Sequence, residues 1–244
     1  MSDPSLLIKT QTLNATDVHI WYADVKDIGS LDASVISDEE CERVSRFVFP
    51  ADRARAKATR TFIRHLLSAY AGYSPNRWQF GENEHGRPRI SGPKLTQELH
   101  FNLSHTNETI VCAIARLPLV GIDIESRVPN DFRQIAQRFF SLKEQQWLAR
   151  EPDDERGSLR FLALWTLKEA YIKALGIGLS HPLQDFSILP QPSEDPRLIE
   201  DLNAQTNNVC WHFRLFNMRP KMPIALAVAF EQAGKPNVIL NQYC

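Results

Sequence analysis

The stretch HFNLSHTNETIVCAIARLPLVGIDIES, residues 100–126, decides the fold class. Three apolar runs of strand length lie within it, at residues 100–106, 109–116 and 119–126. Short connectors separate these runs, one formed by Asn107 and Glu108 and the other containing Pro118. Runs of this length with turn residues between them predict three antiparallel strands that follow one another as a meander.

Two long helical patterns flank these strands. Apolar residues recur at helical spacing over residues 51–70 and 157–175. Each pattern is followed by a glycine, Gly72 or Gly176, and a glycine at this position commonly ends a helix. The alternation of helical and strand patterns along the whole chain predicts an α+β fold.

Shorter patterns complete this prediction. Ser141 and Glu144 have the spacing of a capping box and predict a helix there, and a further helix begins near Asp38. Residues 190–208 are polar and contain three prolines, so we expect a loop. Further strands are predicted at residues 18–22 and 211–230.

The composition narrows the function. The 244 residues suit one large domain or two domains of about 120 residues each. Lysine and arginine number 28 against 29 acidic residues, for a formal net charge of -1, so the charge balance gives no support to nucleic-acid binding. Four cysteines, none in a CxxC pair, are expected to be free thiols in a reducing cytoplasm: Cys41, Cys112, Cys210 and Cys244.

Neither end of the chain predicts association with a membrane. Residues 1–10 lack the basic and apolar segments of a signal peptide. The apolar run at residues 224–230 is too short to cross a bilayer. The sequence therefore predicts a soluble cytoplasmic protein without a membrane partner.

The motif GIDIE, residues 121–125, contains two carboxylates in a predicted strand. Since alternate side chains of a strand share one face, Asp123 and Glu125 lie on one face, and Ile122 and Ile124 lie on the other. Two carboxylates about 7 Å apart on a partly buried face call for a positive partner, and Mg²⁺ prefers such oxygen ligands. A solvated pair without function is the alternative.

The motif WTLKEAYIKALG, residues 165–176, places Glu169 and Lys173 four residues apart on one helix face. Such a pair is commonly a surface salt bridge of little energetic value. The functional interpretation is a third carboxylate for the metal, with Lys168 and Lys173 neutralising phosphate.

Two further motifs are weaker. FNLSHT, residues 101–106, places Ser104 next to His105, but neighbours on a strand point to opposite faces, so a nucleophile–base pair is disfavoured. A hydroxyl and an imidazole near a strand end can instead donate to a phosphate. GRP, residues 86–88, contains Arg87 in a turn, where a guanidinium can contact two oxygens of an anion. Polar turn residues without a ligand explain both motifs equally well.

The order of these motifs is more specific than any one of them. GRP, FNLSH, GIDIE and WTLKEAYIKALG, with FF-S-x-x-E at residues 139–144, resemble the 4'-phosphopantetheinyl transferases of the surfactin-synthetase-activating type. The resemblance covers residues 47–186. It implies two similar α+β halves related by a pseudo-twofold, with a ligand cleft between them. The implied halves are residues 1–117 and 118–244.

The resemblance also implies roles for individual residues. Asp123, Glu125 and Glu169 would bind Mg²⁺, and Glu169 would also serve as the base. The residues implied to contact coenzyme A are cations together with a serine and a histidine: Arg53, Arg87, Ser104, His105, Lys168 and Lys173. Arg87 stands where many members have lysine, so its contact is expected to differ.

The implied reaction transfers phosphopantetheine from coenzyme A to a serine of an apo acyl- or peptidyl-carrier protein and releases 3',5'-ADP. The carrier is expected to contact residues 132–147, where Arg133, Arg138 and Lys143 lie among aromatic residues. Fatty-acid, polyketide, nonribosomal-peptide and lysine-biosynthesis carriers all remain open, and a monomer is expected. Two alternatives are a coenzyme A binding module without catalysis and a metal-dependent hydrolase or nuclease.

Overall fold

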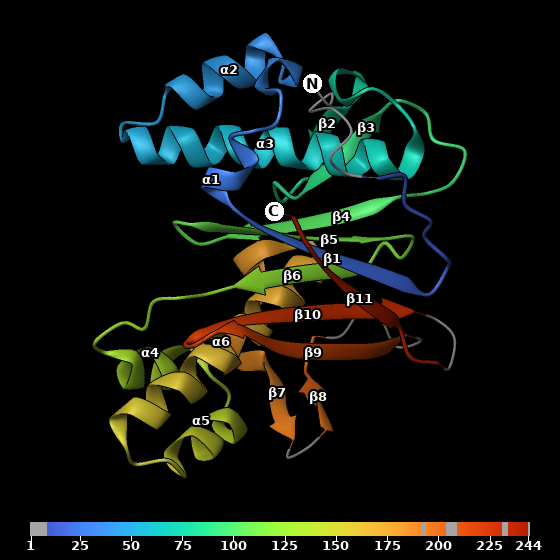
Figure 1. Ribbon diagram of the computed structural model, residues 1–244. Helices are drawn as coiled ribbons and strands as arrows, with labels where there is room; N and C mark the ends of the chain where they lie inside the picture. Colours follow the sequence, from blue (N-terminus) through green and yellow to red (C-terminus); the bar gives the residue numbers. More distant parts are fainter. Residues whose placement is uncertain (1–8, 192–193, 204–208, 231–233, 244) are drawn as a thin grey trace. The chain divides into compact units, whose positions relative to one another are not determined.

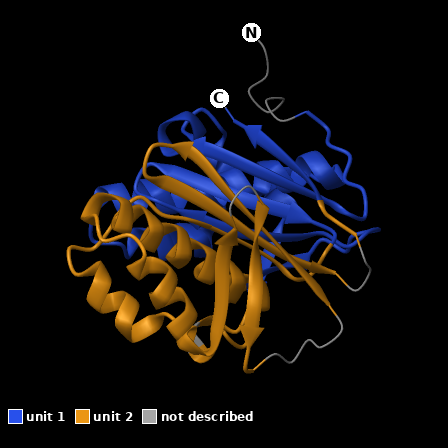
Figure 2. Cartoon of the chain, turned by 90° about the horizontal axis from the view of Figure 1, so that it is seen from below, with its two compact units in different colours: residues 1–82, 88–116, 237–244 blue, residues 83–87, 117–236 orange. Residues whose placement is uncertain are grey.

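The computed structural model describes residues 9–191, 194–203, 209–230 and 234–243 (Figure 1). The chain forms two compact units, which Figure 2 shows in different colours. Unit 1 comprises residues 1–82, 88–116 and 237–244, and unit 2 comprises residues 83–87 and 117–236. The division into residues 1–117 and 118–244 stays a prediction, and so does the pseudo-twofold. The compact units differ from that division at residues 83–87, 117 and 237–244.

The sheet of unit 1 has the strand order β11-β1-β5-β4. Its strands are β1 (Asp17–Asp24), β4 (His100–His105), β5 (Thr109–Ala115) and β11 (Asn237–Gln242). β5 pairs antiparallel with both β1 and β4, whereas β11 pairs parallel with β1. The last strand of the chain therefore extends the sheet that the first strand begins, which is why residues 237–242 belong to unit 1.

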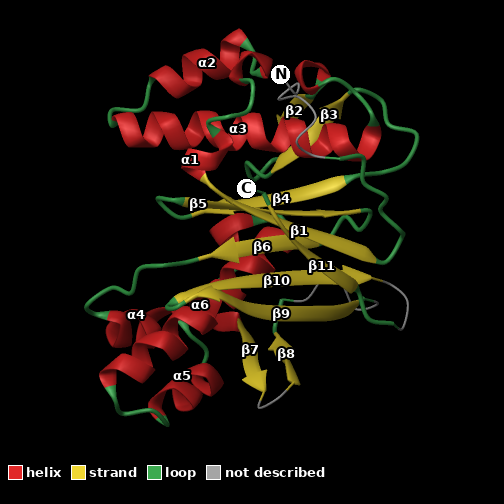
Figure 3. Ribbon diagram, in the orientation of Figure 1, coloured by secondary structure: helices red, strands yellow, loops and turns green. Residues whose placement is uncertain are grey.

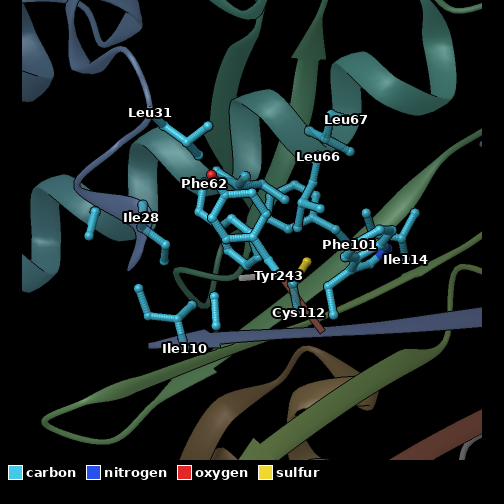
Figure 4. Packing of buried hydrophobic residues seen from close by; sticks show 14 of the residues in the cluster. Ile28, Leu31, Phe62, Leu66, Leu67, Phe101, Ile110, Cys112, Ile114 and Tyr243 are labelled. Carbon is cyan, nitrogen blue, oxygen red and sulfur yellow. The ribbon is translucent and has the colours of Figure 1, made fainter. Parts of the chain in front are cut away.

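A long helix, α3 (Pro50–Ala71), packs on this sheet. Figure 4 shows Phe62 and Leu66 of α3 in one apolar cluster with Cys112 and Ile114 of β5 and with Tyr243. Burial of a large apolar side chain contributes about 1.5–3 kcal/mol, so this cluster carries much of the stability of unit 1. The remaining elements of unit 1 are α1 (Val25–Ile28), η2 (Ala33–Val35), α2 (Asp38–Ser45), η3 (Pro75–Arg77), β2 (Gln79–Glu82) and β3 (Pro88–Gly92).

Unit 2 contains a second sheet, with the order β6-β10-β9. Its strands are β6 (Val120–Ile124), β9 (Cys210–Arg219) and β10 (Met222–Phe230). The helix α6 (Asp154–Leu175) packs on β6 and β10 through Ala170 and Ala174, which share one apolar cluster with Ala225 and Ala227 (Figure 3). Alanine at each of these positions lets a helix and a sheet approach closely.

The other elements of unit 2 surround α6. They are α4 (Phe132–Phe139), α5 (Leu142–Ala149), η4 (Gly178–Ser180), η5 (Leu183–Asp185), β7 (Phe186–Gln191) and β8 (Glu194–Asp201). Phe132 and Phe140 are buried with Phe161 of α6 in a separate apolar cluster. Each unit thus combines helices with strands, and the predicted α+β class is confirmed.

The predicted meander is correct for two of its three strands. β4 and β5 pair antiparallel, but β6 pairs with β10, about a hundred residues further along the chain. Consecutive strands pair in only about two-thirds of cases. An apolar run specifies a strand but not its partner, and this is why the third strand was misplaced.

One other prediction needs correction, and one helix was missed. Residues 190–208 were expected to form a loop, but the described part forms the end of β7 and the whole of β8, which pair antiparallel. Pro196 is buried within β8 and did not prevent strand formation. Residues 192–193 and 204–208 lie outside the described residues. The helix α4 was not predicted, because its 8 residues are too few for a clear period.

Predictions that rested on capping were confirmed. Ser37 and Ser141 cap α2 and α5, and both helices show the complete capping box. The helices α3 and α6 end at Gly72 and Gly176, as predicted, and both glycines have positive φ. Capping depends on a few neighbouring residues, so it can be recognised without knowledge of the fold.

Cys41, Cys112 and Cys210 are free, in agreement with the prediction, whereas Cys244 lies outside the described residues. Residues 1–8 lie outside them as well. Within the described ranges, no helix is both long enough and apolar enough to cross a membrane.

Candidate functional site

The strand β6 presents Asp123 to the helix α6. Asp123 is buried, and the Nζ of Lys173 donates a hydrogen bond to its Oδ1 at 2.6 Å. Ile122 and Ile124 are fully buried. Ile122 pairs with Leu226 of β10, whereas Asp123 pairs with Ala225, a small residue that packs against α6. The predicted alternation of side chains along GIDIE is therefore consistent with the structure, in which Asp123 of this motif contacts Lys173 of the motif WTLKEAYIKALG.

Glu125 and Glu169 complete the group. The backbone N–H of Glu125, just after β6, donates to the carbonyl of Pro223 at 3.3 Å. Burial raises the pKa of Glu125 to about 7; the charge of Asp123 adds to this effect, Lys173 opposes it and Glu169 adds to it again. Burial and the charge of Asp123 likewise raise the pKa of Glu169, with Lys173 opposing. These mutual effects indicate that three carboxylates and one lysine form a single electrostatic group.

The group has a negative excess that a divalent cation would offset. Among the described residues, no set of three or more His, Cys, Asp or Glu side chains is close enough to enclose a metal ion. Mg²⁺ does not require a closed cage of protein ligands, because it commonly keeps several waters and binds phosphate oxygens of the substrate as well as carboxylates. The raised pKa values of two glutamates show that their charges are poorly compensated. The residues therefore fit Mg²⁺ as an open set of oxygen donors.

Lys168 lies outside this group. Its side chain is fully buried, and its Nζ donates to Glu144 Oε1 at 2.8 Å, to Glu144 Oε2 at 2.7 Å and to the Phe186 carbonyl at 2.7 Å. Glu144 also accepts from the backbone N–H groups of Ser141 and Ile188. The pair therefore ties α5, α6 and β7 together, and all donors of the ammonium are engaged within the protein.

Arg87 contacts the end of α6 and the start of β6. Its guanidinium donates to three backbone carbonyls of unit 2, those of Ala174 at 2.8 Å, Val120 at 2.8 Å and Pro118 at 3.3 Å. Asn83, in the same loop, donates to the carbonyl of Gly176 at 2.7 Å. These contacts cover the C-terminal end of α6, where free carbonyls carry partial negative charge.

Three predicted coenzyme A contacts lie in unit 1. Ser104 is buried and His105 is exposed at the end of β4. Arg53 lies in the first turn of α3 and donates to the carbonyls of Phe47 at 2.7 Å and Val48 at 3.1 Å. Arg53 thus holds the chain that enters α3.

The predicted carrier-binding stretch forms α4 and α5. Its aromatic residues Phe132 and Phe140 are buried. Arg138 is exposed, Leu142 is 75% exposed, and Lys143 forms a half-exposed ion pair with Glu200 at 2.5 Å. The surface of this stretch is therefore basic, with one apolar side chain.

A lysine beside several carboxylates suits an enzyme that transfers phosphoryl groups, because such enzymes stabilise the transferred group with lysine and carboxylate-bound Mg²⁺. Comparison with known proteins agrees with this class. The family model of the 4'-phosphopantetheinyl transferase superfamily matches residues 119–229. The model of the N-terminal region of 4'-phosphopantetheinyl transferases matches residues 21–116.

Individual relatives agree. The chain is 33% identical over 195 residues to the 4'-phosphopantetheinyl transferase HetI of Nostoc sp., covering 77% of this chain and 80% of that protein. It is 34% identical over 196 residues to the transferase ffp of Bacillus subtilis, covering 80% and 83%. With the transferase Sfp of Bacillus subtilis it shares 37% identity over 155 residues, covering 64% and 66%. The chain belongs to the 4'-phosphopantetheinyl transferase family, and it is an enzyme of the transferase class.

Among solved structures, a holo-(acyl-carrier-protein) synthase from Bacillus anthracis in complex with CoA is 20% identical. The match covers 46% of this chain and 96% of that one, with a TM-score of 0.39. A TM-score this low does not define a shared fold.

The buried pair of Lys168 and Glu144 leads to a prediction on stability. Lys168→Met leaves the Glu144 carboxylate buried without its cation, so we expect the free energy of unfolding to fall by about 3–5 kcal/mol. The double variant Lys168→Met/Glu144→Gln should regain much of this loss, because a neutral amide still accepts from Ile188. Urea denaturation measures both.

Lys221→Met is the control, since Lys221 forms an exposed ion pair with Glu155 at 2.9 Å. It should change the free energy of unfolding by less than about 1 kcal/mol. A loss for Lys168→Met as small as that of the control would contradict a structural role for the buried pair.

Proposed function

We propose that the chain transfers the phosphopantetheine group of coenzyme A to a serine of an apo carrier protein, with Mg²⁺ bound at Asp123, Glu125 and Glu169. The observation that carries this proposal is the group of three carboxylates and Lys173 in a member of this transferase family. Relatives named as 4'-phosphopantetheinyl transferases support the reaction.

The proposed step is a displacement at phosphorus. The carrier serine Oγ attacks the β-phosphorus of coenzyme A, the bond from that phosphorus to the bridging oxygen breaks, and 3',5'-ADP leaves with the electron pair. Bound Mg²⁺ would stabilise the negative charge on the pyrophosphate oxygens. Lys173 would offset the charge that grows on the leaving oxygen, since positioned charges are the main contribution to phosphoryl transfer.

Glu169 would accept the proton of the serine hydroxyl at a carboxylate oxygen. Its pKa is raised by burial and by Asp123, and a base is more effective when its pKa approaches the working pH. Arg53, Ser104 and His105 are proposed to contact the 3'-phosphate end of coenzyme A, on the basis of the family motifs alone. Lys168 and Arg87 are assigned to the fold rather than to the substrate, because their donors bind backbone carbonyls and a buried carboxylate.

The proposed partner surface is the exposed side of α4 and α5. Arg138, Leu142 and Lys143 offer positive charge around one apolar side chain. This combination suits an acidic carrier, and complementary charge mainly raises the rate of association. A monomeric state stays a prediction.

Asp123→Asn tests the metal assignment. Removal of this carboxylate should lower the rate of transfer about 100-fold or more at saturating coenzyme A, since it removes a charge that acts at the reacting phosphate. The measurement is the intact mass of apo carriers incubated with enzyme, coenzyme A and Mg²⁺, which increases by about 340 Da on modification.

Asp195→Asn is the matched control, because Asp195 is a half-exposed acid that pairs with Arg214 at 2.9 Å in the same unit. It should leave transfer unchanged. A normal rate for Asp123→Asn at saturating Mg²⁺ would refute the metal assignment. Free phosphopantetheine without a modified carrier would indicate the hydrolase alternative, and coenzyme A binding without either product would indicate the module without catalysis.

The raised pKa of Glu125 predicts that the Mg²⁺ requirement of transfer depends on pH. Its pKa is raised to about 7, and a carboxylate must lose its proton to bind a cation. Below pH 7, therefore, the Mg²⁺ concentration for half-maximal transfer should rise with falling pH, by at most about tenfold per pH unit. Glu125→Gln should raise this concentration at pH 8 and remove most of its dependence on pH.

The same raised pKa of Glu125 makes the folding stability of the metal-free protein depend on pH. The pKa of Glu125 is higher in the folded state than its ordinary value of 4.5, so the protonated group favours folding. Its contribution is present below about pH 4.5 and is lost as the pH rises to about 7. Glu125→Gln should therefore raise the melting temperature of the metal-free protein at pH 8 but not at pH 4. An equal effect at both pH values would contradict the shift.

Charge reversal tests the carrier surface. Arg138→Glu and Lys143→Glu together should raise the KM for an acidic carrier about tenfold or more at low salt, and this increase should shrink in higher salt. Glu200→Gln is the control, because it breaks the ion pair of Lys143 without removing positive charge. An unchanged KM in the charge-reversed protein would exclude this surface.

A further inference from the structure

The strand β6 and the helix α6 approach each other closely at Gly121. A Cβ atom on Gly121 would lie 2.1 Å from the Ala170 carbonyl oxygen and 2.4 Å from the Ala174 nitrogen. Real Cβ atoms are essentially never found within 3.0 Å of another heavy atom in this way. The backbones of the strand and the helix are therefore in direct contact, and any side chain at this position would separate them by about an ångström.

This contact lies beside the carboxylate group. Asp123 is two residues further along β6 on the same face, because side chains alternate along a strand. On α6, Glu169 directly precedes Ala170, and Lys173 directly precedes Ala174. The distance between the two backbones at Gly121 consequently sets the distance between Asp123 of the strand and the two charged residues of the helix.

Arg87 holds the same two elements together from the end of the helix. Its Nη1 donates to the Ala174 carbonyl in the last turn of α6, and its Nη2 donates to the Val120 carbonyl at the start of β6. Two arms of one planar guanidinium thus join two elements in a fixed geometry. The negative end of the helix dipole at this position adds to the attraction.

Gly176 shows how tightly this arrangement is packed. Its φ of 71° lies in the left-handed region, and a Cβ atom there would lie 2.9 Å from Arg87 Cδ. The helix therefore ends where the arginine side chain begins. A lysine at position 87 would keep the charge, but its single ammonium could not reproduce the pair of directed bonds.

We propose that Arg87 and Gly121 are positioning residues, which fix the separation of Asp123 from Glu169 and Lys173 and thereby the cation affinity of the group. This inference rests on the proposed function. It assigns Arg87 to the geometry of the site, in place of the direct contact with coenzyme A that its motif implies.

The test compares Arg87→Lys with the wild-type protein in three measurements. These are Mn²⁺ binding to the free enzyme by electron paramagnetic resonance, the Mg²⁺ concentration for half-maximal transfer, and the KM for coenzyme A. A displacement of about an ångström can cost about 100-fold in rate. We expect Arg87→Lys to weaken Mn²⁺ binding and to lower kcat, each by about tenfold or more, with a KM for coenzyme A within about twofold of wild type.

Gly121→Ala should have the same two effects, since it widens the same gap. If this variant does not fold, Arg87→Lys decides alone. The matched control is Arg64→Lys, because Arg64 is a buried arginine of unit 1 that also donates to backbone carbonyls, those of Trp78 and Pro75. It should lower the melting temperature and leave Mn²⁺ affinity unchanged.

The opposite result is equally clear. A raised KM for coenzyme A in Arg87→Lys, with Mn²⁺ binding and kcat at wild-type values, would show that Arg87 binds the substrate and would overturn this inference. Failure of the proposed function itself is distinguishable, because the wild-type protein would then neither bind Mn²⁺ nor modify any carrier.

Discussion

The contact between β6 and α6 is the constraint on which the site of unit 2 depends. Gly121 has no side chain, and Ala170 and Ala174 have only methyl groups, so two backbones meet where side chains usually intervene. This close approach brings carboxylates from two separate elements into one group with Lys173. Burial raises the pKa values of Glu125 and Glu169, and the neighbouring charge of Asp123 adds to this effect.

A second polar arrangement supports the same helix from its other side. Lys168 immediately precedes Glu169, yet it points into the interior and binds Glu144 and the Phe186 carbonyl. A buried ion pair seldom adds much net stability, but it strongly disfavours arrangements in which either partner is left alone. The pair therefore favours the rotation of α6 in which Lys173 reaches Asp123 of β6.

Local signals in the sequence were reliable. The Ser141 and Glu144 pattern predicted the start of α5, and Gly176 predicted the end of α6, because both signals act within a few residues. The alternation in GIDIE correctly separated Asp123 from its isoleucine neighbours. The partner of β6 was misassigned and the strand β8 was missed, since strand pairing depends on residues distant in the chain.

In the candidate site, too, local sequence patterns did not predict contacts between residues that are distant in the chain. Glu144 was recognised only as part of a capping box, and nothing local in the sequence indicated that its carboxylate would also receive Lys168. The family resemblance implies that Arg87 and Lys168 contact coenzyme A. The donors of both are directed at groups of the protein itself. A motif records which residue types are present, whereas burial and hydrogen-bond geometry decide what each of them can contact.

The sequence by itself determined the α+β class, the ends of the long helices, the family and the residue types available for chemistry. These properties follow from short-range patterns and from the order of motifs along the chain. Only the tertiary structure decided which carboxylates meet Lys173, which cations are used within the fold, and that the last strand pairs with the first. The reason is that these contacts join residues up to 220 positions apart, and their formation depends on the packing of whole elements.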